Sequence, residues 1–240
     1  MDGFESGDLS SSANGVSYGG NVETAVSTEN SLMGDYSLRF TYPAAPNGSD
    51  SFSEQRMNYP QTNELWIRYN LYVPTNYVHR TQSGAANNKF LAVYKDEYRY
   101  PGFQVNWSLS PDGSGGSNLS LHRYRNGSEQ RVISPSNGIG VGFITQADRG
   151  KWIQIVARIK APSSQNSSDG VMQMWKDGEF VTNETTLDNY GGAGENYMDE
   201  LYLLGWSNSG FSEQTVFYID DLHINDGTPF VQPSPPTLLD

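Results

Sequence analysis

The stretch KWIQIVARIKA (residues 151–161) alternates apolar and polar side chains along almost its whole length. Every second residue from Ile153 to Ile159 is apolar, while Gln154 and Arg158 lie between them. A period of two is that of a β-strand, in which successive side chains point to opposite faces. We therefore expect a strand with one face in a hydrophobic core and the other face outside it.

The same alternation recurs along the chain and predicts an all-β protein. Seven further stretches show it: residues 64–73, 89–95, 102–110, 118–125, 170–178, 200–206 and 215–224. Segments rich in glycine, serine and asparagine separate them, and no stretch has the spacing of a helix of three turns. Many strands at this spacing indicate a sandwich or a barrel.

Of these architectures we expect a two-sheet antiparallel β-sandwich that forms a single domain over residues 1–230. Residues 231–240 contain closely spaced prolines, which cannot join a sheet, and we expect them to form a tail or a linker.

The 240 residues carry a formal net charge of −12 and include no cysteine. An acidic surface argues against non-specific binding to nucleic acid or anionic membranes, because both require cationic groups. No apolar run approaches the roughly 20 residues that span a bilayer, so membrane insertion is not expected. Without cysteine, the chain has no disulfide framework and no thiol catalysis.

The first residues, MDGFESGDLSSS, lack the basic and apolar regions of a signal peptide. We expect an extracellular or secreted protein that reaches the outside by another route or from a longer precursor, or one on the surface of a virion. The sequence does not indicate whether the protein is a monomer or an oligomer.

The polar sides of several predicted strands carry amide, aromatic and basic side chains. Amides and hydroxyls pair with sugar hydroxyl groups, and aromatic faces stack on the C–H patches of sugars. Such a surface indicates a polysaccharide partner, although the outer faces of sandwiches are polar in general. Three pairs share the polar side of their strands: Gln104 with Asn106, His122 with Tyr124, and Gln173 with Trp175.

The sequence contains no zinc-protease, nucleophile-elbow, phosphate-loop or dinucleotide motif. Glycoside hydrolysis is disfavoured, because retaining enzymes need two carboxylates about 5 Å apart, whereas the adjacent acids of IDDL (219–222) face opposite ways on a strand. The other glycan chemistry is β-elimination of a uronate. It needs a group that neutralises the carboxylate, a base for the C5 proton and an acid for the leaving O4. The candidate catalytic residues of these types are Lys89, Arg68, His122 and Tyr124.

Each candidate also has an ordinary structural explanation. Lys89 lies in NNKFLAVYKDEY (87–98), where it could cap a strand end, and Arg68 could pair with a neighbouring acid. The histidine and the tyrosine could belong to an ordinary polar face. Strand parity places Lys89 on the same side as Leu91 and Val93, so no polar partner follows it two residues on.

Two acidic segments predict a structural calcium site. GFESGD (3–8) and YIDDLHIND (218–226) lie near the two ends of the chain, and the terminal strands of sandwiches often lie side by side. Carboxylate oxygens together with loop carbonyls are suitable Ca²⁺ ligands, although acids at strand ends can also be merely solvated. The candidate metal ligands are Glu5, Asp8 and Asp221, with Asp220 beside them. We expect no organic cofactor.

The order of several motifs along the chain resembles the concanavalin A-like polysaccharide lyases, which include the heparin lyase I-like family and its alginate and glucuronan lyase relatives. The motifs that carry the resemblance are DGFESGD (2–8), GDYSLRFTY (34–42), SEQR (53–56), ELWIRYNLYVPTNY (64–77), GKWIQIVARIKA (150–161), DGVMQMWKDGEFV (169–181) and FYIDDLHI (217–224). Together they run over nearly the whole chain.

The resemblance implies a two-sheet jelly roll whose concave face binds a polysaccharide. It also implies that Lys89 occupies the strand where related lyases carry a lysine or a Gln-x-His element, and that His122 and Tyr124 take part in proton transfer. Arg56, in SEQR, matches an arginine that often lies near the cleft. The chain departs from the family pattern where Gln104 and Asn106 replace a Ser-x-Arg pair, which removes one carboxylate-neutralising cation.

Three functions follow from these observations. The leading one is a lyase that cleaves an acidic, uronate-containing polysaccharide by β-elimination. The second is a non-catalytic, lectin-like carbohydrate-binding module, and the third is a structural or decoration protein of a virion or cell surface. The expected substrate-binding residues are Arg56, Gln104, Asn106, Gln173 and Trp175.

Overall fold

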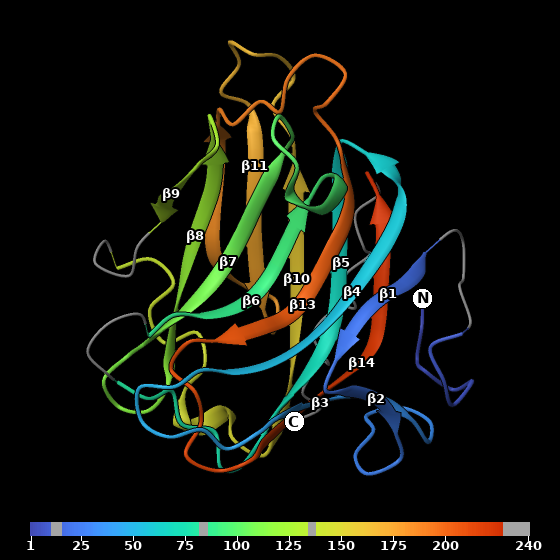
Figure 1. Ribbon diagram of the computed structural model, residues 1–240, viewed down its shortest axis with the longest axis vertical. Coiled ribbons are helices and arrows are strands. Elements are labelled where there is room, and N and C mark those ends of the chain that lie inside the picture. Colours follow the sequence, from blue (N-terminus) through green and yellow to red (C-terminus); the bar gives the residue numbers. More distant parts are fainter. Residues whose placement is uncertain (11–15, 82–85, 134–137, 228–240) are drawn as a thin grey trace, which may run out of the picture.

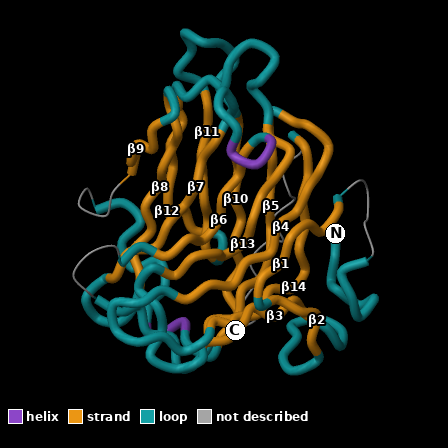
Figure 2. Tube along the Cα trace, in the orientation of Figure 1, coloured by secondary structure: helices purple, strands orange, loops and turns teal. Residues whose placement is uncertain are grey.

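The computed structural model describes residues 1–240 except 11–15, 82–85, 134–137 and 228–240. The described chain consists of strands and loops, with two short 3₁₀ turns at Asp96–Tyr98 and Gln146–Asp148 (Figure 2). None of its helices is long and apolar enough to cross a membrane. The tail predicted over 231–240 lies outside the described residues.

In the described part of the chain, fourteen strands form two antiparallel sheets of seven, one behind the other in Figure 1. In spatial order, the first sheet contains β1 (Ser17–Val22), β4 (Ser51–Thr62), β13 (Met198–Ser207), β6 (Asn88–Tyr94), β7 (Gln104–Pro111), β8 (Ser117–Arg125) and β9 (Ser128–Ile133). The second contains β12 (Glu179–Leu187), β11 (Gly170–Lys176), β10 (Lys151–Lys160), β5 (Glu64–Val73), β14 (Thr215–Asp226), β3 (Ser37–Tyr42) and β2 (Thr24–Ser27). The predicted fold class, a two-sheet antiparallel β-sandwich, is confirmed.

The hydrophobic core lies between the sheets. Ile153, Ile155 and Ile159 of β10 are buried there, on the side that the alternation predicted. Burying an aliphatic or aromatic side chain contributes about 1.5–3 kcal/mol to folding, so a strand with several such residues on one side is held in a single orientation. Each of the eight stretches predicted as strands contains a strand in the structure.

The parity predicted for Lys89 is wrong. Its strand was expected to place Lys89 on the same side as Leu91 and Val93, both of which are in the core. Instead, the pairing of β6 with β7 shifts register between Lys89 and Leu91, so that Lys89 lies opposite Ser108 and Leu91 lies opposite Trp107. Such an irregularity moves the following side chains to the other face, and the lysine therefore stands on the outer face of the first sheet.

Candidate active site

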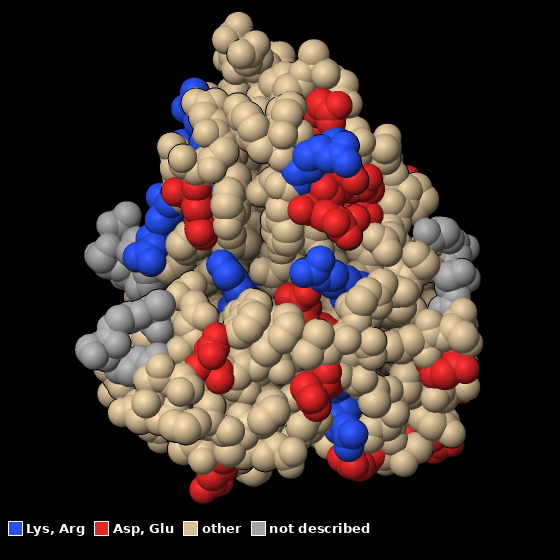
Figure 3. All heavy atoms as spheres, viewed as in Figure 1, with Lys and Arg blue, Asp and Glu red and all other residues tan. Residues whose placement is uncertain are grey.

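A cleft of about 780 Å³ lies on the outer face of the first sheet. Strands β6, β7, β8 and β13 form its floor, and four segments near the upper strand ends in Figure 1 form its walls: residues 98–102, 124–127, 165–166 and 188–192. Figure 3 shows this face of the molecule, which is hollowed along its middle and has acidic and basic side chains on either side. The sheet thus provides the floor of the cleft, and the loops form its side walls.

Cross-strand pairing places predicted residues from three strands, β4, β7 and β8, in one row across this face. Tyr202 on β13 lies opposite both Arg56 on β4 and Ala92 on β6. Ala92 in turn lies opposite Asn106 on β7, and Asn106 lies opposite His122 on β8. The antiparallel register therefore brings together side chains that are far apart in the sequence.

Lys89 and Lys95 differ sharply, although they come from the same stretch. The Lys95 side chain is only 4% exposed and forms ion pairs with Glu195 and, at 3.6 Å, with Asp96. Lys89 lines the cleft and is half-buried. In the described part of the chain, no residue forms an ion pair or a hydrogen bond with its side chain. Lys89 is therefore the cation that the cleft leaves available.

Glu129 on β9 connects three of the polar side chains on this face. Its Oε1 lies 2.9 Å from His122 Nδ1 and accepts a hydrogen bond of 3.4 Å from Asn106 Nδ2. The hydrogen bond from His122, together with the positive charge of Lys89, lowers the pKa of Glu129 to about 2. Burial, and next the charge and hydrogen bond of Glu129, raise the pKa of Tyr124 to about 12. At neutral pH the site thus contains a carboxylate and a protonated phenol.

The two amides of β7 have different surroundings. Gln104 donates through Nε2 to the carbonyls of Tyr98 and Arg99, at 2.6 and 3.4 Å, so this amide holds the turn that forms one wall. Asn106 accepts a hydrogen bond of 2.9 Å from the Ser108 hydroxyl. Asn106 donates one N–H to Glu129, and no other described residue accepts from its amide, so its second amide hydrogen is available to a ligand.

Tyrosines form the other side of the cleft, and the sequence interpretation did not include them. Tyr98 stacks on Tyr94 with ring centroids 3.8 Å apart, and Tyr202 lies 6.2 Å from Tyr98. Next to them, Arg56 donates to Glu54 at 2.7 Å. Burial raises the pKa of Glu54, against the opposing effect of Arg56.

The sequence could have indicated one of these additional residues, Tyr202, but not Glu129 or Tyr98. Parity within 200–206 could have placed Tyr202 on the outer face, because Leu201 and Leu203 are in the core. Glu129 lies in the polar strand β9, which has no apolar alternation to reveal it. Tyr98 lies in a turn with positive φ, where side-chain direction does not follow strand parity.

Three predicted site residues lie on the second sheet and do not join the cleft. Arg68 on β5 contacts Asp221 at 3.2 Å and His223 at 2.6 Å. On β11, Gln173 donates to Asn183 at 2.7 Å, and Trp175 stacks on Trp66 at 5.7 Å. For β11, parity identified the outer side of the strand correctly, but it cannot indicate to which of two sheets a strand belongs.

The predicted calcium ligands also have protein partners. Glu5 accepts hydrogen bonds from the backbone N–H groups of Asp35 and Tyr36, both at 3.1 Å. Asp8 accepts from the Ser10 hydroxyl and N–H, and Asp221 pairs with Arg68 as described above.

Asp220 is buried and accepts from the N–H groups of Leu32 and Met33. Among the described residues, no three histidine, aspartate or glutamate side chains gather as metal ligands would. As placed, the acids do not fit a calcium ion; calcium binding stays a prediction, which a lower melting temperature in EDTA would support.

Comparisons with known proteins identify the family from the sequence and the fold from solved structures. The model of the polysaccharide lyase family matches residues 4–222. No curated protein matches the sequence.

Solved structures with a similar fold include two alginate lyases and an agarase. A variant of alginate lyase Aly36B in complex with an alginate trisaccharide has a TM-score of 0.66 at 12% identity, covering 91% of this chain and 96% of its own. Alginate lyase vAL-1 from Chlorella virus has a TM-score of 0.61 at 8% identity, covering 87% and 92%. β-Agarase A from Zobellia galactanivorans has a TM-score of 0.54 at 13% identity, covering 89% and 94%. At such identities the likeness establishes the fold alone.

Proposed function

Because the chain belongs to the polysaccharide lyase family, we propose that it cleaves a uronate-containing polysaccharide by β-elimination in the cleft over the first sheet. The observation that carries this proposal is Lys89, a cation in the cleft to which the described residues give no ion pair. Tyr124, a proton donor, and Asn106, an amide, line the same cleft.

In the proposed reaction, the Lys89 ammonium first releases a proton to solvent, and the free amine then accepts the proton from C5 of the uronate. The electron pair of the C5–H bond forms the C4=C5 double bond, and the C4–O4 bond breaks. Tyr124 then protonates O4 of the leaving chain. With its pKa raised to about 12, the phenol keeps its proton near neutral pH and is able to give it to the developing alkoxide.

The uronate carboxylate must be stabilised while negative charge develops at C5. We assign this task to Asn106, whose carbonyl is oriented by the Ser108 hydroxyl. His122 acts indirectly in this scheme. It is buried, and its Nδ1 holds Glu129, so it positions the carboxylate that contacts Asn106 and Tyr124.

The test is incubation of the protein with alginate, glucuronan, heparin, chondroitin sulfate and ulvan in separate reactions. β-Elimination produces an unsaturated uronate, which absorbs in the ultraviolet, so we expect a rise in absorbance with at least one polymer. No rise with any of the five would overturn the proposal.

A second candidate function is carbohydrate binding without cleavage. The observation that favours it is Glu129, a carboxylate near enough to Lys89 for the two charges to interact. A lysine that is partly neutralised, with no arginine at position 104 or 106, suits a lectin-like site. Retarded migration in gels containing a polymer, together with no unsaturated product, would identify this function.

A further inference from the structure

An aromatic pair lies on the same outer face as the cleft, outside its boundary. Phe52 on β4 and Trp206 on β13 lie directly opposite each other in the strand register. Their ring centroids are 4.5 Å apart and their planes differ by 16°, so the two rings stack. Along β4, alternate side chains share a face, and Phe52 therefore lies on the same side as Glu54 and Arg56.

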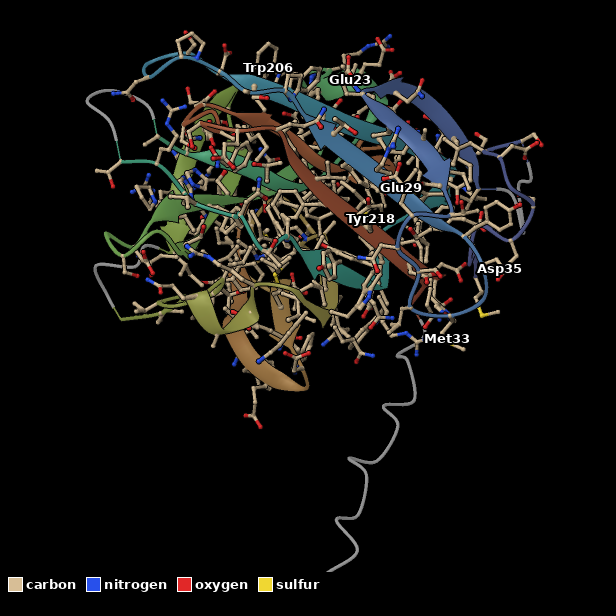
Figure 4. The ribbon with its side chains drawn as sticks, turned by 90° about the horizontal axis from the view of Figure 1, so that it is seen from below. Glu23, Glu29, Met33, Asp35, Trp206 and Tyr218 are labelled. Carbon is tan, nitrogen blue, oxygen red and sulfur yellow. The ribbon has the colours of Figure 1, made fainter. Side chains whose placement is uncertain are left out.

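The pair presents an open aromatic surface. Trp206 is 46% exposed, and Phe52 is half-buried beside it. In Figure 4, Trp206 lies on the outer side of the first sheet, away from the second sheet. Because Phe52 supports one side of the indole, the orientation of the ring is fixed before any ligand arrives, which lowers the entropic cost of binding.

The backbone next to Trp206 passes directly beside Lys89. Gly205 has a φ of +116°, which only glycine adopts readily. A Cβ at this position would lie 3.1 Å from Glu54 Oε2, 3.1 Å from the Tyr202 ring and 3.3 Å from Lys89 Cβ. The aromatic pair therefore adjoins the point at which these cleft side chains meet.

The pair and the cleft walls lie on different sides of Lys89 along the strands. The walls are loops at the upper strand ends, beyond Gln104 and Tyr124. Trp206 lies toward the other end, since the following residue, Ser207, is opposite Asn88, which precedes Lys89. A chain that occupied the cleft and continued past Lys89 would thus reach Trp206.

We propose that Phe52 and Trp206 form a sugar-stacking subsite for the part of the polysaccharide that continues beyond Lys89. The inference rests on the proposed function of the cleft, and it adds that the polymer is bound on both sides of Lys89, as cleavage within a chain requires. An indole contacts the C–H face of a sugar ring without needing an opposite charge. Between the pair and Lys89, the Glu54 carboxylate is neutralised by Arg56 at 2.7 Å, so this part of the floor does not present an unpaired negative charge to an acidic polymer.

The experiment measures binding in a Lys89→Ala background, which prevents consumption of the polymer. Trp206→Ala is compared with Phe180→Ala, a matched control on β12. Phe180 is 57% exposed and packs on Trp175 at 4.6 Å, but it belongs to the second sheet. Migration in gels with increasing alginate, glucuronan, heparin, chondroitin sulfate or ulvan gives the dissociation constant. We expect Trp206→Ala to weaken binding by roughly 3- to 10-fold and Phe180→Ala to leave it within about twofold.

The inference would be overturned if Trp206→Ala were retarded as strongly as the Lys89→Ala parent protein. It would also be overturned if Trp206→Ala and Phe180→Ala lost the same affinity, or if no polymer retarded the Lys89→Ala parent protein. A further variant, Trp206→Leu, keeps an apolar side chain on Phe52 and removes the flat ring; the same loss is expected, and full affinity would also overturn the inference. The proposed function fails by a different result, namely no unsaturated product from the unmodified protein. The two failures are therefore distinguishable.

Discussion

The outer faces of the two sheets carry similar side chains in different surroundings. On the second sheet, Arg68 pairs with Asp221, and Arg158 pairs with Glu64 at 2.8 Å while lying over the Trp66 ring. On the first sheet, Lys89 has no such pair among the described residues. A cation whose interactions are already satisfied within the protein stabilises a sheet, whereas an unpaired one is available to a ligand.

The loops beside the first sheet add to the difference between the two outer faces. Segments around Tyr100 and Tyr190 rise beside the first sheet and enclose a cleft. Walls reduce the exposure of a cleft to water, and electrostatic interactions inside it are stronger than on an open surface. Residue type alone does not identify a site; the pairing of the charges and the walls around them do.

The largest effect is expected from removing the unpaired cation. Lys89→Ala should lower the initial rate of unsaturated-product formation by roughly 10²-fold or more, because it removes the proposed base. Arg68→Ala, which removes a cation of the second sheet, should leave the rate within about twofold. Equal losses in the two variants would remove the functional distinction between the faces.

Lys89→Arg sharpens the role of this residue. Arginine keeps the positive charge but does not lose its proton in proteins, so the variant should be as inactive as Lys89→Ala. If Lys89→Arg instead retains most of the activity, Lys89 neutralises the carboxylate and another group accepts the proton. Initial rates at saturating polymer separate the two outcomes.

Tyr124→Phe is expected to have the next largest effect. The substitution keeps the ring and removes only the hydroxyl that would protonate O4, and the turnover number should fall by roughly 10²-fold. Tyr72→Phe is the control on the second sheet, where Tyr72 packs near Trp152 at 5.5 Å; its turnover should not change. A Tyr124→Phe variant with normal turnover would assign the proton transfer to another residue.

Arg68→Ala and Lys89→Ala should affect stability in the opposite order from activity: Arg68→Ala should be the more damaging to stability. Arg68→Ala removes the guanidinium that contacts Asp221 and His223 in a partly buried site, and we expect it to lower the free energy of unfolding by about 1 kcal/mol. Lys89→Ala breaks no ion pair with a described residue and should change that free energy by less than about 0.5 kcal/mol. Urea unfolding of both variants at one pH measures the difference, and a larger loss from Lys89→Ala would show that this lysine has a structural role.

Structural features that depend on neighbouring residues in the sequence were predicted, whereas features that depend on contacts between distant segments were not. Strand β10 was predicted at 151–161 and runs from Lys151 to Lys160, because alternation is a local signal. For the same reason, the sequence predicted that Gln104 and Asn106 lie on one face of their strand. Strands β1 and β9 were not predicted, because SYGGNV and SEQRVI show little apolar alternation.

The rest of the site depends on contacts between distant segments. The side to which Lys89 points depends on a register shift against β7, which leaves no mark in the local sequence. Trp175 was placed on the correct side of its strand, yet the cleft is on the other sheet, and only the order of strand pairing decides this. Glu129 enters the site because β9 pairs with β8.

The smallest expected effect is a difference in the pH dependence of stability between the two faces. Beside the cleft, the folded pKa of Glu129 is about 2 against an ordinary 4.5. Its contribution to stability is therefore present above pH 4.5 and is lost as the pH falls from 4.5 towards 2. On the second sheet, burial is the main cause that lowers the pKa of His223 below its ordinary 6.5. The contribution of this neutral histidine is lost as the pH falls below 6.5.

Glu129→Gln should thus flatten the stability profile below pH 4.5, and His223→Gln should flatten it just below pH 6.5. Both groups are partly exposed to solvent, so each effect should be no more than about 1 kcal/mol. Urea midpoints measured from pH 7 to pH 3 resolve the two ranges. If Glu129→Gln changed the profile only above pH 4.5, the carboxylate would not be held ionised by His122 and Lys89, and the electrostatic account of the cleft would have to be replaced.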